Sequence, residues 1–158
     1  MNVGSWLLCG FAATVVLTAL MAGAQGLRLT RMSLPYLLGT LVTGERDRAK
    51  VYGVGVHLLN GWIFSAVYVA AFHALGLLTW WFGALVGFVH ASFVLAVAMP
   101  ALPGMHPRMA SATHGPTVTR QLQPPGFLGR YYGNRTPVSV LVAHLVFGAL
   151  LGGFYSPG

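Results

Sequence analysis

Two histidines in this chain begin the same sequence pattern, and they are the residues best placed to do chemistry. His57 begins H-L-L-N-G-W-I-F-S-A-V-Y, and His144 begins H-L-V-F-G-A-L-L-G-G-F-Y. In both, glycine follows at plus four, a small residue at plus eight and tyrosine at plus eleven, so these positions share one helical face. The pattern predicts an internal duplication.

A third histidine, His90, lies on the same helical face as Gly83 and Gly87. A rise of about 1.5 Å per residue places His57, His90 and His144 at a similar depth in the membrane. Three imidazoles at one depth are candidate ligands for haem iron or another metal, or contacts for a ligand such as a quinone. The alternative is structural, with each histidine hydrogen-bonded to a neighbouring helix. No cysteine or carboxylate joins them, which argues against zinc.

Four apolar segments are long enough to cross a bilayer as helices, which takes roughly 20 residues each. They are Trp6–Ala24, Val51–Leu75, Leu78–Met99 and Val138–Tyr155. Charged residues make up 7% of the chain, against about 25% in a soluble domain, and the mean hydropathy is +0.70. We therefore predict an all-α, four-transmembrane-helix bundle forming a single membrane domain over residues 1–158.

Small residues recur every four positions in three of these segments. Such stripes let helix backbones approach closely, either within the bundle or against a second copy or a partner protein. We expect helix packing at Gly61, Ser65, Gly83, Gly87, Gly148 and Gly152.

All nine basic residues lie in the two long loops between apolar segments, and the formal charge is +7. The positive-inside rule places both loops in the cytoplasm and both termini outside the cytoplasm, in a bacterial inner membrane. The two histidine-bearing helices then run the same way, so the hairpins are parallel repeats, at about 5–75 and about 78–155. Basic loops beside apolar spans suit anionic lipid rather than nucleic acid.

Two stretches of these loops are too apolar and aromatic for a solvated linker. Their composition predicts short helices at the membrane interface, at Leu34–Val42 and at Phe127–Tyr132. Met99–Gln123, rich in Pro, Ser, Thr and Gly, is predicted to be the least ordered stretch.

Groups for catalysis are few. The only acids, Glu45 and Asp47, lie in a loop, so no carboxylate is available inside a span. The chain has no nucleophile triad, phosphate-binding loop or dinucleotide fingerprint, and we expect no enzymatic activity.

The chain resembles a family of small four-helix bacterial integral membrane proteins, a family of unknown function. The matching motifs are P-x-x-L-G before the second span, His57-x-x-x-Gly61, His106-Pro107-Arg108-Met109, Pro125-Gly126-Phe127-Leu128 and His144-x-x-x-Gly148-x-x-x-Gly152-x-x-Tyr155. They cover most of the chain beyond the first span. The family has no assigned reaction or cofactor, so the resemblance implies an architecture and no activity.

Three functional hypotheses follow. The favoured one is a structural or accessory membrane protein that packs through its glycine faces and contacts a partner or lipid through its basic loops. The alternative is a haem- or metal-binding redox protein with His57 and His144 as axial ligands and His90 as a third candidate. A small channel or carrier is a further alternative, although no charged ring would line its path.

Overall fold

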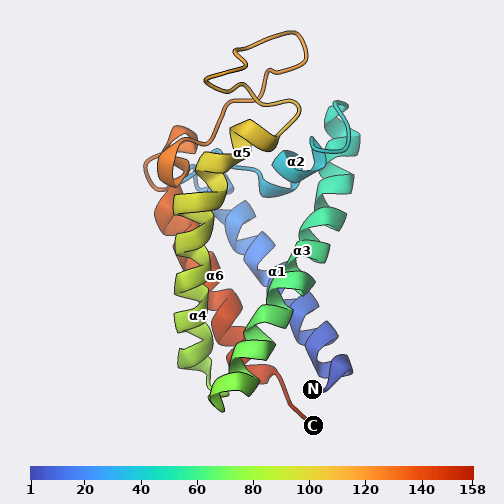
Figure 1. The fold of residues 1–158 in the computed structure, drawn as a ribbon, viewed down its shortest axis with the longest axis vertical. Helices are drawn as coiled ribbons and strands as arrows, with labels where there is room; N and C mark the ends of the chain where they lie inside the picture. Colours follow the sequence, from blue (N-terminus) through green and yellow to red (C-terminus); the bar gives the residue numbers. More distant parts are fainter.

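The computed structural model describes residues 1–158 and is all-helical, with four helices long and apolar enough to cross a membrane. The four spans are α1 (Val3–Gly26), α3 (Arg46–Leu75), the continuous run from α4 (Trp80–Phe93) to α5 (Met99–Met105), and α6 (Thr136–Phe154). Both termini lie at one end of the bundle and both long connections at the other (Figure 1). The predicted all-α fold with four spans is confirmed.

The sequence at the helix ends explains where the helices begin and stop. The Asn2 side chain accepts a hydrogen bond from the Ser5 N–H at 3.0 Å and caps α1, and Thr79 caps α4 through the Phe82 N–H. Helix α3 ends at Gly76, whose φ of 64° lies in the left-handed region that favours glycine. The chain therefore reverses tightly between α3 and α4.

The third span is longer than predicted, because the helix continues past Met99 to Met105 through two prolines. A π-helical turn, η1 (Val94–Ala98), precedes Pro100, and the Met99 N–H bonds to the Val94 carbonyl five residues earlier. Proline has no N–H to satisfy the carbonyl four residues before it, and a wider turn accommodates that loss without ending the helix. The stretch predicted to be least ordered thus begins as a helix.

The helices do not pack evenly around the bundle. Helix α4 packs along α6, and α1 packs against both α6 and α3. Although α3 and α4 are consecutive, their backbones lie close only near the shared turn, and α3 instead packs on the short helix α2 (Leu34–Gly39). Farther from the turn α3 and α4 meet through side chains, such as Phe64 and His90. In Figure 1 the two helices diverge from the turn toward the loop end.

All six residues expected at helix contacts are buried in the structure. Gly83 of α4 lies against the backbone of Gly148 and Gly152 of α6, and Gly87 lies against the His144 carbonyl. Gly61 lies against the Thr14 side chain of α1, and the Ser65 hydroxyl accepts a 2.8 Å hydrogen bond from the Trp6 indole. A side chain at these glycines would force the helices apart.

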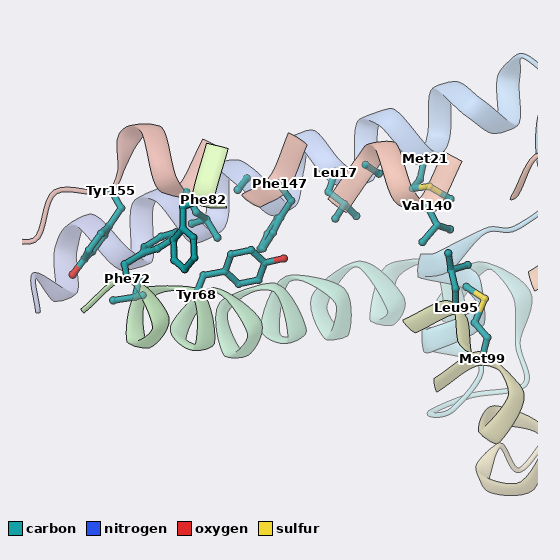
Figure 2. Packing of buried hydrophobic residues seen from close by; sticks show 14 of the residues in the cluster. Leu17, Met21, Tyr68, Phe72, Phe82, Leu95, Met99, Val140, Phe147 and Tyr155 are labelled. Carbon is teal, nitrogen blue, oxygen red and sulfur yellow. The ribbon is translucent and has the colours of Figure 1, made fainter. Parts of the chain in front are cut away.

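The core near the termini is aromatic. Tyr68 and Phe72 of α3 lie beside Phe82 of α4, Phe147 of α6 and Tyr155, which directly follows α6 (Figure 2). The Tyr68 and Phe147 rings meet edge to face, with centroids 5.3 Å apart. This half of the bundle is filled by interlocking rings.

The two long connections, residues 27–45 and 106–135, fold together into what we call the loop cap. Its predicted helix at Leu34–Val42 is present as α2, which is shorter. The helix predicted at Phe127–Tyr132 is wrong as one continuous element, because Leu128 and Gly129 have φ of 58° and 70° and break it into two 3-10 turns, η2.

Hydrogen bonds join the two halves of the cap. The Arg31 N–H donates to the Tyr132 carbonyl at 2.7 Å, and the Thr30 hydroxyl lies 2.7 Å from the hydroxyl of Thr136, the first residue of α6. Arg108 donates to the Thr40 carbonyl at 2.6 Å, at the end of α2. The cap is therefore one folded unit over the end of the bundle.

The last part of the stretch predicted to be least ordered also has defined backbone contacts. The Ala110 N–H donates to the Leu122 carbonyl at 3.2 Å, and the Leu122 N–H donates to the Arg108 carbonyl at 3.0 Å. These two bonds close the loop between Met109 and Gln121 at its base.

Candidate functional site

The three histidines singled out in the sequence come together around one cavity. His57 lies on α3, His90 on α4 and His144 on α6, and all three line a cavity of about 210 Å³. The remaining lining is mostly apolar and comes from every long helix and from the cap: Thr14, Leu17, Met21, Met32, Leu34, Leu37, Leu38, Asn60, Gly61, Phe64, Phe93, Val94, Ala98, Met99, Leu102, Val140 and Phe147. No Asp, Glu, Lys or Arg is among them.

His144 is held by its own helix. Its Nδ1 lies 2.8 Å from the Val140 carbonyl one turn earlier. A carbonyl oxygen only accepts, so Nδ1 carries the hydrogen, and the Nε2 of a neutral ring is left as an acceptor. The backbone thus fixes the tautomer of His144.

His90 is held by aromatic side chains. Its ring stacks on Phe64 with centroids 4.2 Å apart, and its Nδ1 lies 3.1 Å from the Tyr68 hydroxyl. It meets the His144 ring edge to face, with centroids 4.7 Å apart. Helices α3, α4 and α6 therefore share one aromatic contact around His90.

His57 differs from the other two. It is 8% exposed, and its Nε2 is the one buried side-chain nitrogen or oxygen in the chain without a hydrogen-bond partner. Buried polar groups are normally paired, because desolvation without a partner costs about 1–3 kcal/mol. His57 also lines the cavity, and a ligand atom that reached its Nε2 would complete the hydrogen bonding.

A second hollow of about 220 Å³ adjoins the first at His57. It lies between α1, the start of α2 and α3, and its lining includes Thr18, Gln25 and Ser33. Met21, Met32 and Leu34 line both hollows. His57 therefore stands between an apolar chamber and a more polar one near the cap.

The arrangement does not fit haem. The His90 and His144 rings touch each other, so no iron with its macrocycle lies between these two. The predicted axial pair, His57 and His144, shares a cavity that is too small for a macrocycle. The glycines one turn after His57 and His144 leave no room for a macrocycle either, since Thr14 fills the space at Gly61 and the Gly83 backbone fills the space at Gly148. A cavity of about 150 Å³ holds one benzene, so 210 Å³ holds one ring rather than four pyrroles.

The side chains do not form a site for a bare metal ion either. No three His, Cys, Asp or Glu side chains are close enough together to hold one. In the cap, His106 is engaged through both ring nitrogens, with Nε2 3.1 Å from the Leu37 carbonyl and Nδ1 accepting from the Arg108 N–H at 3.1 Å.

Sequence reasoning did not identify much of the cavity wall. Met21 of α1 and Met32, Leu34 and Leu37 of the cap face the histidines, yet they look like ordinary apolar residues in the sequence. Only the predicted short helix near Leu34 hinted that the loop could cover the bundle.

Comparison of the chain with protein-family models, curated proteins and solved structures found no match. The fold and the site together define a multi-pass helical membrane protein with a histidine-lined cavity between its helices.

Proposed function

We propose that this is a non-enzymatic accessory protein of the bacterial inner membrane, with its loop cap in the cytoplasm and both termini outside. The observation that carries the proposal is that most basic residues at the end of the bundle that bears the cap are exposed, while two are bonded inside the cap. Arg108 and Arg120 are half-buried and donate to backbone carbonyls inside the cap. The other seven are exposed: Arg28, Arg31, Arg46, Arg48, Lys50, Arg130 and Arg135.

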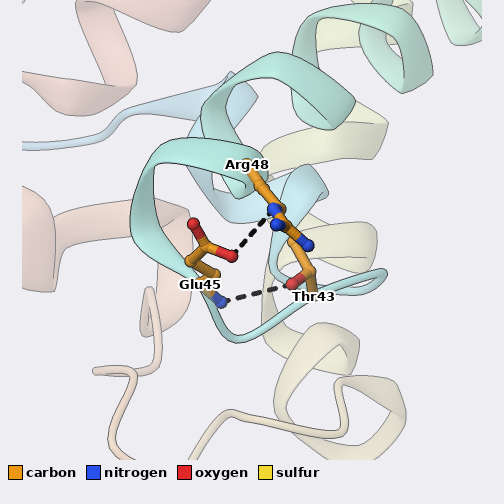
Figure 3. A network of polar contacts seen from close by, with 3 residues as sticks. All are labelled: Thr43, Glu45 and Arg48. Carbon is orange, nitrogen blue, oxygen red and sulfur yellow. Dashed lines mark hydrogen bonds and ion pairs between the residues drawn. The ribbon is translucent and has the colours of Figure 1, made fainter.

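Some of these exposed charges are paired with the only acids. Arg48 lies 2.9 Å from Glu45 (Figure 3), and Lys50 lies 3.1 Å from Asp47. The other five, Arg28, Arg31, Arg46, Arg130 and Arg135, have no acidic partner within the chain. A surface with this excess of cations suits anionic headgroups and an acidic partner surface, at about 1 kcal/mol per residue near a charged leaflet.

The bundle supports a scaffold role. Backbone contacts at Gly83 and Gly148 hold α4 and α6 together without side chains between them. The exposed outer faces are apolar, with Leu8, Ile63 and Val89 all more than half exposed. Such faces suit lipid and the spans of a membrane-protein partner or of a second copy.

We also propose the duplication into two parallel hairpins. The pairs α1–α3 and α4–α6 are both packed pairs. Their contacts have diverged, because Gly61 meets Thr14 while the equivalent Gly148 meets Gly83. If Gly10 is aligned with Gly87, the residue of the second hairpin that corresponds to Thr14 is Ala91. Ala91 lies about two helical turns from Gly83, so the two hairpins make these contacts at different levels along the helix.

The channel alternative gains no support from the packing. Tyr68, Phe72, Phe82 and Phe147 fill the bundle on the side of the cavity toward the termini, so the cavity does not continue through the bundle.

Orientation is tested with single cysteines. In a Cys9→Ser background, His114→Cys places a thiol in the cap and Ser156→Cys places one in the C-terminal tail. A membrane-impermeant maleimide added to intact spheroplasts should label the tail variant only, and both after lysis. Labelling of the cap variant in intact spheroplasts would overturn the orientation.

The accessory role is tested by isolation. In vivo cross-linking followed by mild-detergent purification should recover a second membrane protein or a second copy. The recovery should fall in the triple variant Arg28→Gln, Arg130→Gln, Arg135→Gln and survive in the charge-preserving Arg→Lys triple variant. A lone monomer in every case contradicts the proposal.

A further inference from the structure

We propose that the cavity binds a neutral, ring-headed amphiphile of the quinone or phenol type, with a head-group oxygen hydrogen-bonded to His57. The inference is independent of the accessory role and concerns the interior of the bundle rather than its surfaces.

The polar groups of the cavity define the head group. His57 presents an Nε2 that has no partner, and the fixed tautomer of His144 leaves its Nε2 as an acceptor. The amide of Asn60 also lines the cavity. A quinone carbonyl would accept a hydrogen bond from the Asn60 N–H or from a protonated His57 Nε2, and a phenol hydroxyl would donate to the His144 Nε2.

The absence of charged lining residues sets the charge of the occupant. A carboxylate, phosphate or ammonium head would lose its hydration and meet no countercharge, at a cost of several kcal/mol. A neutral oxygen loses little, because the histidines replace its water hydrogen bonds. Charged ligands are therefore disfavoured.

The volume and walls set the size. A chamber of about 210 Å³ is somewhat larger than the cavity of about 150 Å³ that accepts benzene. Its walls include Phe64, Phe93 and Met99, which give an aromatic head both stacking and thioether contacts. One substituted ring fits, and a long tail has to leave the chamber.

The tail has an exit between α3 and α4 on the cap side of the Phe64–His90 stack, where the backbones of the two helices lie apart. Phe93 lines the cavity and is nevertheless 50% exposed on the outer surface of the bundle. The π-helical turn at Val94–Ala98 follows directly, and both Val94 and Ala98 line the cavity. Such turns occur frequently at functional sites because they displace side chains from regular packing.

Binding is tested with a decyl-substituted benzoquinone titrated into the full-length protein in phosphatidylcholine nanodiscs. The dissociation constant is measured from tryptophan fluorescence, and the His57 ring nitrogens are followed by ¹⁵N NMR. We expect saturable binding and a shift of the His57 Nε2 resonance. His57→Phe should weaken binding about tenfold, the loss expected for one buried hydrogen bond.

Three controls make the test decisive. His73→Phe, on the same helix but bonded to the Tyr155 hydroxyl at 3.0 Å, should bind like the wild type. His57→Phe removes an unpaired buried nitrogen and should unfold no earlier than the wild type. Decylbenzene has the same tail without oxygen, and its binding should be weaker and insensitive to His57→Phe.

Equal affinity of wild type and His57→Phe for the quinone would overturn the proposal. So would equal binding of the quinone and decylbenzene, which would make the cavity a site for lipid chains only. Absence of saturable quinone binding to the folded wild type would also overturn it.

Discussion

Both halves of the bundle are built mainly from apolar residues, but they are packed differently. Toward the termini, Gly83 and Gly148 bring two backbones into contact, and aromatic rings fill the remaining space. Toward the cap, α3 leaves α4 and rests on α2, and a cavity remains. His144 marks the boundary, since its carbonyl lies against Gly87 while its ring lines the cavity. Glycine placement thus decides where the helices touch and where they separate.

The largest effect is expected where backbones meet. In Gly148→Ala the new methyl overlaps the Gly83 carbonyl, so α4 and α6 must separate at a cost of about 3 kcal/mol. Gly55→Ala, in the cap-side half of α3, meets open space and should stabilise the helix by up to about 1 kcal/mol. Unfolding in SDS followed by circular dichroism measures both, and similar effects would contradict the difference between the halves.

A second contrast lies within one span. Ala91 is fully buried, so Ala91→Leu should overpack the bundle and cost about 2 kcal/mol. Ala98 lines the cavity, and Ala98→Leu should change stability by less than about 1 kcal/mol because the added side chain has room. The same SDS titration compares them. A larger loss for Ala98→Leu would mean that the cavity is not open space.

The cap should respond to pH through His106, which lies outside the spans. Burial lowers its pKa, the Leu37 carbonyl opposes this by raising it, and Arg108 and Arg120 lower it further. The unfolded chain therefore binds a proton below about pH 6.5 that native His106 does not. Stability is full above that value and falls as the pH drops below it, until native His106 also protonates.

The readout for His106 is cleavage of the cap loop by a protease, between Ala110 and Gln121, as a function of pH. Cleavage of the wild type should accelerate below about pH 6.5, and His106→Gln should show a flatter profile. His114, exposed in the same loop, provides the control, because His114→Gln should keep the wild-type profile. Identical profiles for all three proteins would exclude His106 as the sensitive group.

The smallest effect is expected at the surface of the cap. Arg48→Ala removes the ion pair with Glu45 (Figure 3), whose side chains are 70% and 56% exposed. Exposed pairs contribute about 0.2–1 kcal/mol, and salt screens them. The SDS midpoint should move little at low salt and not at all at high salt. A loss as large as that of Gly148→Ala would show that the cap, rather than the glycine contacts, holds the bundle together.

Much of the architecture could be predicted, because it depends on local features. Apolar length located the four spans, and spacing located Gly83, Gly148 and the other contact residues. Leu34–Val42 was recognisable as a short helix by its apolar composition. The continuation of the third span through Pro100 was missed, since proline normally ends a helix and only the π-helical turn accommodates it here.

The site was predicted only as a set of residues. Periodicity places a histidine at a depth and on a face, but the partner of each ring depends on how the helices tilt. His144 bonds to its own backbone, His90 to Tyr68, and His57 to nothing. The sequence pattern makes His57 and His144 equivalent, and the packing makes them different.

The sequence by itself determined that lipid, rather than water, surrounds most of the protein. It also determined the number of spans and the end of the bundle that carries the positive charge. These follow from side-chain hydrophobicity and from the obligation of each backbone to hydrogen-bond within a helix in lipid. Tertiary structure alone decided that α3 leans onto α2, that Met32 and Leu37 cover the histidines, and that a chamber remains beneath them. Those outcomes depend on contacts between residues far apart in the chain, which close packing selects collectively and no local pattern encodes.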